Sequence, residues 1–216
     1  MRRSILKEIK NLTRKLIECG LAVNHNFPRE SNGFVTWSKQ KNLSIALKNI
    51  DYRDIYKELN KSKNYNIKMI DGALIQMLYT SSKKEITSHT LAFYPSPELE
   101  RYQDNIKDYE EYYYGEGVYA DIILKHIVSF PLRFDYSPKQ HIDVTHPKVH
   151  MHLGLYKDCR IPVSTPLTPN VYIGFLLRNF YSSAFKEHFD TYNFNSVKVA
   201  KTITKKEERI LHINQN

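Results

Sequence analysis

Cysteine is scarce in this sequence of 216 residues, which contains only Cys19 and Cys159 and has no CxxC pair. Two cysteines cannot build a framework of several disulfides or a four-cysteine zinc site. Long hydrophobic runs are also missing, since none approaches the ~18 apolar residues that cross a membrane. The N-terminal residues carry charges every three or four positions, unlike the unbroken apolar segment of a signal peptide. We therefore expect a cytoplasmic protein.

Glycine and proline are few, with 7 and 9 residues, which argues against a low-complexity or disordered chain. Aromatic residues are plentiful instead, because 16 Tyr and 10 Phe are available to form a core. The length fits one α+β domain. We predict a single domain over residues 1–216, frayed at its C-terminus. It should have a basic, largely helical N-terminal layer at 1–68 and a charge-neutral α+β body at 69–216.

Acidic residues are too few in the first third of the chain to balance the basic ones. Residues 1–68 hold 15 Lys and Arg against 6 Asp and Glu, a net charge of +9, whereas residues 69–216 hold 17 of each sign. Such a basic segment could bind nucleic-acid phosphates, an anionic membrane or an acidic partner. An ordinary solvated surface explains it equally well. If it binds nucleic acid, the predicted contacts are Arg2, Arg3, Lys7 and Lys10.

Local patterns predict several helices and strands. Apolar residues at helical spacing indicate an N-terminal helix that ends near Gly20; they are Ile5, Ile9, Leu12 and Leu16. Residues 34–38 are typical of a short strand, and residues 51–59 of a short helix with an acidic cap. The β-rich runs within 73–94 predict a hairpin. Seven acidic residues lie in 98–116, which is more typical of a solvated helix than of a metal site.

Alternation of apolar and polar residues predicts a second hairpin at about 127–155. If its strands pair antiparallel, their apolar side chains share a face only when opposed residue numbers sum to an odd value. The predicted core face then holds Leu132, Phe134, Val149, Met151 and Leu153. The same register brings Arg133 and Asp135 next to His150 and His152 on the other face. We therefore expect an antiparallel sheet that contains both hairpins.

These four polar residues suit two kinds of chemistry, and the loop between the strands adds His141, Asp143 and His146. Two histidines can act as a general acid/base pair on a phosphodiester, while Arg133 counters the developing charge and Asp135 orients a histidine. Alternatively, His150, His152 and Asp135 can hold a divalent metal ion that activates water. The simplest alternative is that these polar residues form the solvent-exposed face of an ordinary hairpin and have no catalytic role. Four histidines within 141–152 favour a site.

A further helix is predicted from Thr168, an N-cap that precedes Pro169. The helix is apolar almost all round, so we expect it to be buried against the sheet. Arg178 would then be buried too, either paired with a carboxylate, which we favour, or directed into a site. The residues predicted to bind phosphate or substrate are His146, Arg160 and Arg178.

Several runs between about Arg133 and Phe185 carry a resemblance to a known family; they are PLRFDYSP, HPKVHMHLG, DCRIPVSTPLTP, and FLLRNFY followed by AF. They resemble an uncharacterised bacterial family, domain of unknown function 2290. The resemblance implies a setting in antiphage defence, with a helicase as partner, and it assigns no catalytic residue. The aromatic-Asp strand, the proline–histidine turn and the HxH strand are also similar to parts of small toxin ribonucleases of bacterial toxin–antitoxin pairs.

Two functions of different classes remain open, besides a third interpretation as an antitoxin-like or scaffold protein with no nucleic-acid contact. The first is a nuclease or phosphodiesterase that uses the His/Arg/Asp cluster, and we prefer it. The second is a non-catalytic accessory module that binds nucleic acid through its basic third and docks a helicase. The sequence lacks Walker, HNH-type and Asp…Glu-x-Lys patterns, which weakens the first. It also lacks a recognisable nucleic-acid-binding module, which weakens the second. Neither function involves a membrane partner.

Overall fold

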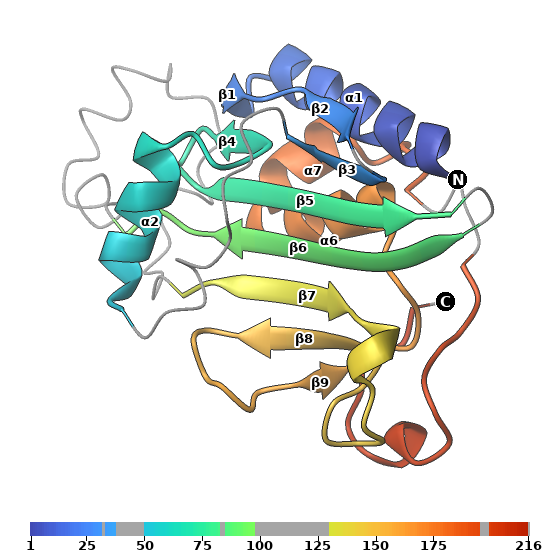
Figure 1. The fold of residues 1–216 in the computed structure, drawn as a ribbon. Helices are drawn as coiled ribbons and strands as arrows, with labels where there is room; N and C mark the ends of the chain where they lie inside the picture. Colours follow the sequence, from blue (N-terminus) through green and yellow to red (C-terminus); the bar gives the residue numbers. More distant parts are fainter. Residues whose placement is uncertain (32, 38–49, 83–84, 98–129, 195–198, 216) are drawn as a thin grey trace.

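The computed structural model describes residues 1–31, 33–37, 50–82, 85–97, 130–194 and 199–215. In this part of the chain a nine-stranded antiparallel sheet has helices on both faces, which confirms the predicted α+β class (Figure 1). The helices are α1 (Arg2–Glu18), α2 (Tyr52–Lys61), α6 (Pro169–Phe180) and α7 (Ser182–His188). The strands are β1 (Ala22–His25), β2 (Pro28–Ser31), β3 (Phe34–Trp37), β4 (Ile67–Met69), β5 (Leu74–Ser81), β6 (Ile86–Tyr94), β7 (Leu132–Tyr136), β8 (Val149–Leu153) and β9 (Ile161–Pro162).

The strands follow the order β1-β4-β5-β6-β7-β8-β9, and β3 pairs with both β2 and β5. The hairpin predicted at about 73–94 is formed by β5 and β6, and the one predicted at about 127–155 is formed by β7 and β8. Residues 127–129 of the second prediction, and the acidic helix predicted within 98–116, lie outside the described residues. No helix of the described residues has the length and apolarity needed to cross a membrane.

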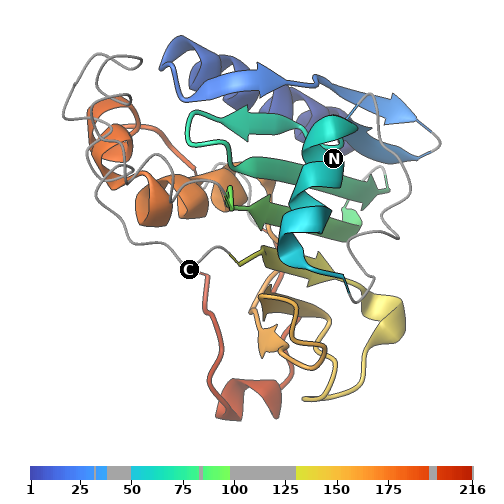
Figure 2. The ribbon, with the colours of Figure 1, turned by 90° about the vertical axis from the view of Figure 1, so that its left-hand side faces the viewer.

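One face of the sheet packs against α1, α6 and α7 (Figure 2). The buried residues of α1 include the predicted stripe of Ile5, Ile9, Leu12 and Leu16. The helix ends as predicted at Gly20, which has a φ of +70°. There the N–H groups of Gly20 and Leu21 donate to the carbonyls of Ile17 and Leu16. Glycine suits this left-handed position because it has no Cβ, so the chain turns sharply into β1.

The opposite face of the sheet is covered by α2 at one end only, among the described residues (Figure 2). The side chain of Asp51 caps this helix, as predicted, by accepting from the Arg53 N–H. Ile55 packs with Leu74 and Tyr94 in a second, smaller apolar cluster. Farther along β5 and β6, the same face carries the buried Gln76 and then Leu78 among the polar side chains of Thr80, Ser88 and Thr90. The uncovered end of this face is therefore mostly polar.

Helix α6 begins as predicted, because the Thr168 hydroxyl accepts from the Val171 N–H at 3.3 Å. Its buried side carries Ile173, Leu176 and Leu177, but its other side faces solvent. Arg178 lies on the solvent side, with its guanidinium carbon 5.1 Å from the centre of the Phe185 ring. The prediction that Arg178 is buried is therefore wrong. The helix has one apolar stripe, and Arg178 falls outside it.

The C-terminal segment is anchored to the sheet, contrary to the expectation that it is frayed. Ile213 forms a parallel bridge with Val163, just after β9. Its carbonyl accepts from the Ser164 N–H and its own N–H donates to the Pro162 carbonyl, both at 2.9 Å. This bridge directs the C-terminal chain past the loop that joins β7 to β8 (Figure 1).

The stability of the protein should depend more on the buried side of α6 than on its half-exposed aromatic residue. We expect Leu176→Ala to lower the free energy of unfolding by about 2–5 kcal/mol, because it leaves a cavity in the core. Phe175→Ala should cost less, under about 2 kcal/mol, because Phe175 is only half-buried. Urea denaturation of both variants measures the two values. A larger loss for Phe175→Ala would contradict this account of the helix.

Candidate functional site

The predicted register of β7 and β8 is confirmed. Arg133 lies opposite His152, and Asp135 lies opposite His150, so each pair of residue numbers has an odd sum. The neighbouring pairs of Leu132 with Leu153 and Phe134 with Met151 point to the other side of the sheet. Because β-strand side chains alternate, the four polar residues share the face that α2 leaves uncovered.

Arg133, Asp135 and His152 form a connected polar group on this face. The Arg133 Nε donates to the Asp135 Oδ2 at 2.8 Å. The His152 Nε2 lies 3.4 Å from the same oxygen. Burial alone would raise the pKa of Asp135, but the contacts with His152 and Arg133 outweigh it and lower that pKa to about 2. Asp135 is therefore a carboxylate at neutral pH.

His150 is held in one orientation by the backbone. Its Nδ1 lies 2.8 Å from the carbonyl oxygen of Pro147, and a carbonyl only accepts, so Nδ1 carries the hydrogen. Burial lowers the pKa of His150 to about 4, although the bond to Pro147 and the charge of Asp135 oppose this shift. His150 is therefore neutral at pH 7, with its lone pair on Nε2. Its ring centre is 4.8 Å from that of His152 and 4.9 Å from that of His146.

These residues border a cleft of about 930 Å³. His150 itself is only 1% exposed, whereas the side chain of Asp135 is 17% exposed. The predicted residues His146 and Arg160 also line the cleft. Burial and the charge of Arg160 lower the pKa of His146. Polar residues of β5 and β6 and the rings of Tyr94, Tyr136 and Tyr156 complete the walls.

The other predicted contact residues do not reach this cleft. Arg178 is on α6, which packs on the opposite face of the sheet. The guanidinium of Arg2 is occupied, because it donates to the Ser81 carbonyl and lies 3.0 Å from the Glu30 carboxylate. Arg3 and Lys7 are exposed on α1 and Lys10 is half-buried, so these three form a basic strip away from the cleft.

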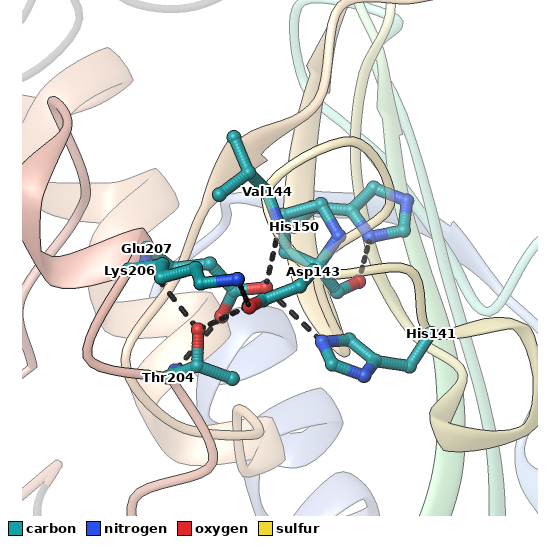
Figure 3. Close-up of polar contacts among 8 residues, drawn as sticks. His141, Asp143, Val144, His150, Thr204, Lys206 and Glu207 are labelled. Carbon is teal, nitrogen blue, oxygen red and sulfur yellow. Dashed lines mark hydrogen bonds and ion pairs between the residues drawn. The ribbon is translucent and has the colours of Figure 1, made fainter.

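A second polar cluster, which the sequence did not predict as a unit, joins the C-terminus to the β7–β8 loop (Figure 3). Glu207 is 1% exposed, and its carboxylate accepts from the Thr204 N–H at 2.9 Å and the Val144 N–H at 3.4 Å. Its Oε1 also lies 3.2 Å from the His141 Nε2. The Thr204 hydroxyl donates to Asp143 at 2.5 Å. We call Thr204, Glu207 and their loop partners His141, Asp143 and Val144 the C-terminal latch.

The latch restrains the loop that orients the histidines of the cleft. That loop also carries His146 and Pro147, the two residues that contact His150. Val144 has a φ of +69°, which is strained for a β-branched residue, and its N–H is the group that Glu207 binds. The sequence did hold a signal for this cluster. Thr204 and Glu207 form a T-x-x-E capping box at the start of the short helix Glu207–Arg209.

The fold and the site together define an α+β protein with a histidine–carboxylate cluster in a cleft on one face of an antiparallel sheet. The chain belongs to the family described as "Uncharacterized conserved protein (DUF2290)", whose sequence model matches residues 21–215. The match therefore includes the whole cleft and the latch and excludes α1. Comparison with curated proteins and with solved structures gives no match.

The latch should contribute measurably to stability. We expect Glu207→Gln to lower the free energy of unfolding by about 1–3 kcal/mol, because the buried amide nitrogen cannot accept a hydrogen bond and one of the three partners loses its acceptor. Glu208→Gln is the matched control, since Glu208 is the exposed neighbour and should change stability by less than about 0.5 kcal/mol. Chemical denaturation of both variants gives the comparison. Equal stability of the two variants would show that the latch contributes nothing.

Proposed function

We propose that this protein hydrolyses phosphodiester bonds of nucleic acid in the cleft between β6, β8 and the β8–β9 loop. The observation that supports this most strongly is the grouping of three reactive side chains beside two arginines. Ligand atoms of Asp135, His150 and His152 all lie within 4.8 Å of one another. Arg133 and Arg160 flank them in the same cleft.

Arg160 is the residue best suited to bind the phosphate. Its Nη1 makes a 3.3 Å contact with Asp158, whose side chain is 83% exposed, so this ion pair is weak. Its Nε is buried and has no hydrogen-bond partner among the described residues. The Arg160 side chain also lines the cleft, and the planar set of donors of a guanidinium matches the geometry of phosphate oxygens. Arg133, in contrast, is bound to Asp135 and mainly orients that carboxylate.

The bond changes are those of any phosphodiester hydrolysis. The oxygen of a water molecule forms a bond to phosphorus while the bond from phosphorus to the leaving oxygen breaks. One proton leaves the attacking water, and the leaving oxygen takes up a proton. The lone pair on His150 Nε2 suits proton removal or metal binding, and the arginines offset the charge that develops on the phosphoryl oxygens.

The family resemblance suggests the setting of this activity, a bacterial defence system against phage with a helicase as partner. The geometry of the site supports the proposed hydrolysis, whereas the family resemblance supports the proposed setting and partner. The basic strip on α1 would supply additional contacts to nucleic acid from the far side of the sheet. If this protein binds nucleic acid through the strip but does not cleave it, the alternative function applies, that of a non-catalytic accessory module.

Cleavage should depend on the histidines of the cleft. We expect the wild-type protein to cleave labelled DNA or RNA oligonucleotides in a buffer that contains Mn²⁺ or Zn²⁺. His150→Ala and His152→Ala should each lower the rate by about 10²-fold or more, as loss of a positioned acid or base does. His188→Ala is the control, because His188 lies on α7 behind the sheet. No cleavage by the wild type, or equal rates in all variants, would favour the accessory module.

Nucleic-acid binding through α1 should weaken with salt. Each neutralised phosphate on duplex DNA contributes about −0.9 to the slope of log K against log salt. Replacing Arg3, Lys7 and Lys10 by Gln should therefore make this slope less negative by up to about 3. Arg2 is left unchanged, because its contacts to Ser81 and Glu30 hold α1 to the sheet. Fluorescence anisotropy at several salt concentrations measures the slopes, and an unchanged slope would remove α1 from the interface.

A further inference from the structure

The contact between His152 and Asp135 has the spacing of an ion pair but not the geometry of a hydrogen bond. The His152 Nε2 is 3.4 Å from the Asp135 Oδ2. This nitrogen is nevertheless buried without a hydrogen-bond partner among the described residues, and His152 is only 7% exposed. Leaving a buried imidazole nitrogen without a partner costs free energy, so such a group usually has one.

The same spacing is the one expected for two ligands of a single metal ion. Zinc bonds to histidine nitrogen and carboxylate oxygen are about 2.0–2.2 Å, so tetrahedral ligand atoms lie about 3.4 Å apart. The third reactive side chain, His150, completes a set of ligand atoms that all lie within 4.8 Å of one another. Because the ligand atoms of one tetrahedral ion lie about 3.4 Å apart, a small movement of the side chains would bring all three residues around one position beside the cleft.

The surroundings of these residues also resemble those of metal ligands. A ligating histidine usually donates its other ring N–H to a carbonyl or carboxylate, and a ligating carboxylate is itself hydrogen-bonded. His150 donates from Nδ1 to Pro147, which directs Nε2 away from the loop. Asp135 accepts from Arg133 at 2.8 Å.

We propose that Asp135, His150 and His152 bind one divalent first-row transition-metal ion at the floor of the cleft. Two imidazoles and one carboxylate favour Zn²⁺, Mn²⁺ or a similar ion over Mg²⁺ and Ca²⁺, which prefer oxygen ligands only. Three protein ligands leave a coordination position for water or a phosphate oxygen. This site rests on the proposed function, since it gives the cofactor of the same centre, but it can be tested without any substrate.

The C-terminal latch contains a comparable set of residues, His141, Asp143 and Glu207, yet its ligand atoms are already in use. Both oxygens of Glu207 accept backbone N–H groups. Asp143 accepts from Thr204 and lies 3.4 Å from the Lys206 ammonium, whose charge would repel a cation. The latch is therefore a structural network.

The test is a titration of protein without a histidine tag, stripped with a chelator, by Co²⁺ followed through its visible absorption bands. We expect binding of one equivalent, which Zn²⁺ displaces and Mg²⁺ does not. His150→Ala and His152→Ala should each weaken binding by more than about 100-fold, and Arg133→Gln by about 10–100-fold, as loss of an outer partner does. His188→Ala on α7, behind the sheet, should leave binding unchanged.

Several results would overturn the proposal. They are the absence of stoichiometric binding, binding that survives both His150→Ala and His152→Ala, and binding that is lost in His188→Ala. Circular dichroism of each variant, together with the conservative His152→Gln, shows whether a loss reflects unfolding. Metal binding without cleavage would keep this site and reject the proposed activity. Cleavage by the stripped protein in the presence of a chelator would keep the activity and reject the metal.

Discussion

The register between β7 and β8 is the constraint on which the rest of the site depends. A shift of β7 by one residue along β8 would turn Leu132 and Phe134 towards the cleft and place Arg133 and Asp135 beneath α6, so that the two pairs of polar residues would lie on opposite faces. The core under these strands makes that shift costly, since Phe134 packs against the rings of Tyr172 and Phe175. The packing of the apolar face thus fixes the positions of Asp135 and His152 on the polar face.

The polar cluster depends on what covers each face of the sheet. Three helices bury one face, whereas α2 covers the Leu74 and Tyr94 end of the other. The cleft begins where α2 stops, so buried and solvent-accessible polar groups meet there. His150 is almost inaccessible, while the Arg133 side chain remains 25% exposed. Buried groups such as His150 can therefore have altered pKa values, while partly exposed neighbours such as Arg133 leave the site open to a substrate.

Alternation and helical spacing were sufficient to predict α1, the two hairpins and the start of α6, because each depends on local sequence or on a two-residue period. They failed for Arg178, since a predominantly apolar helix does not reveal which side faces solvent. They also missed the latch, which joins His141 to Glu207 across the whole β8–α6–α7 region. Its capping box was visible in the sequence, but its partner loop was not.

The claim that Asp135, His150 and His152 form one site is tested most directly by NMR of the histidine side chains. Long-range ¹H–¹⁵N correlation spectra identify the hydrogen-bearing nitrogen of each ring. We expect His150 to carry its hydrogen on Nδ1, where Pro147 accepts it. Addition of one equivalent of Zn²⁺ should then shift the Nε2 signals of His150 and His152 and leave those of His141 in place. A hydrogen on Nε2 of His150, or zinc shifts at His141 alone, would contradict the account.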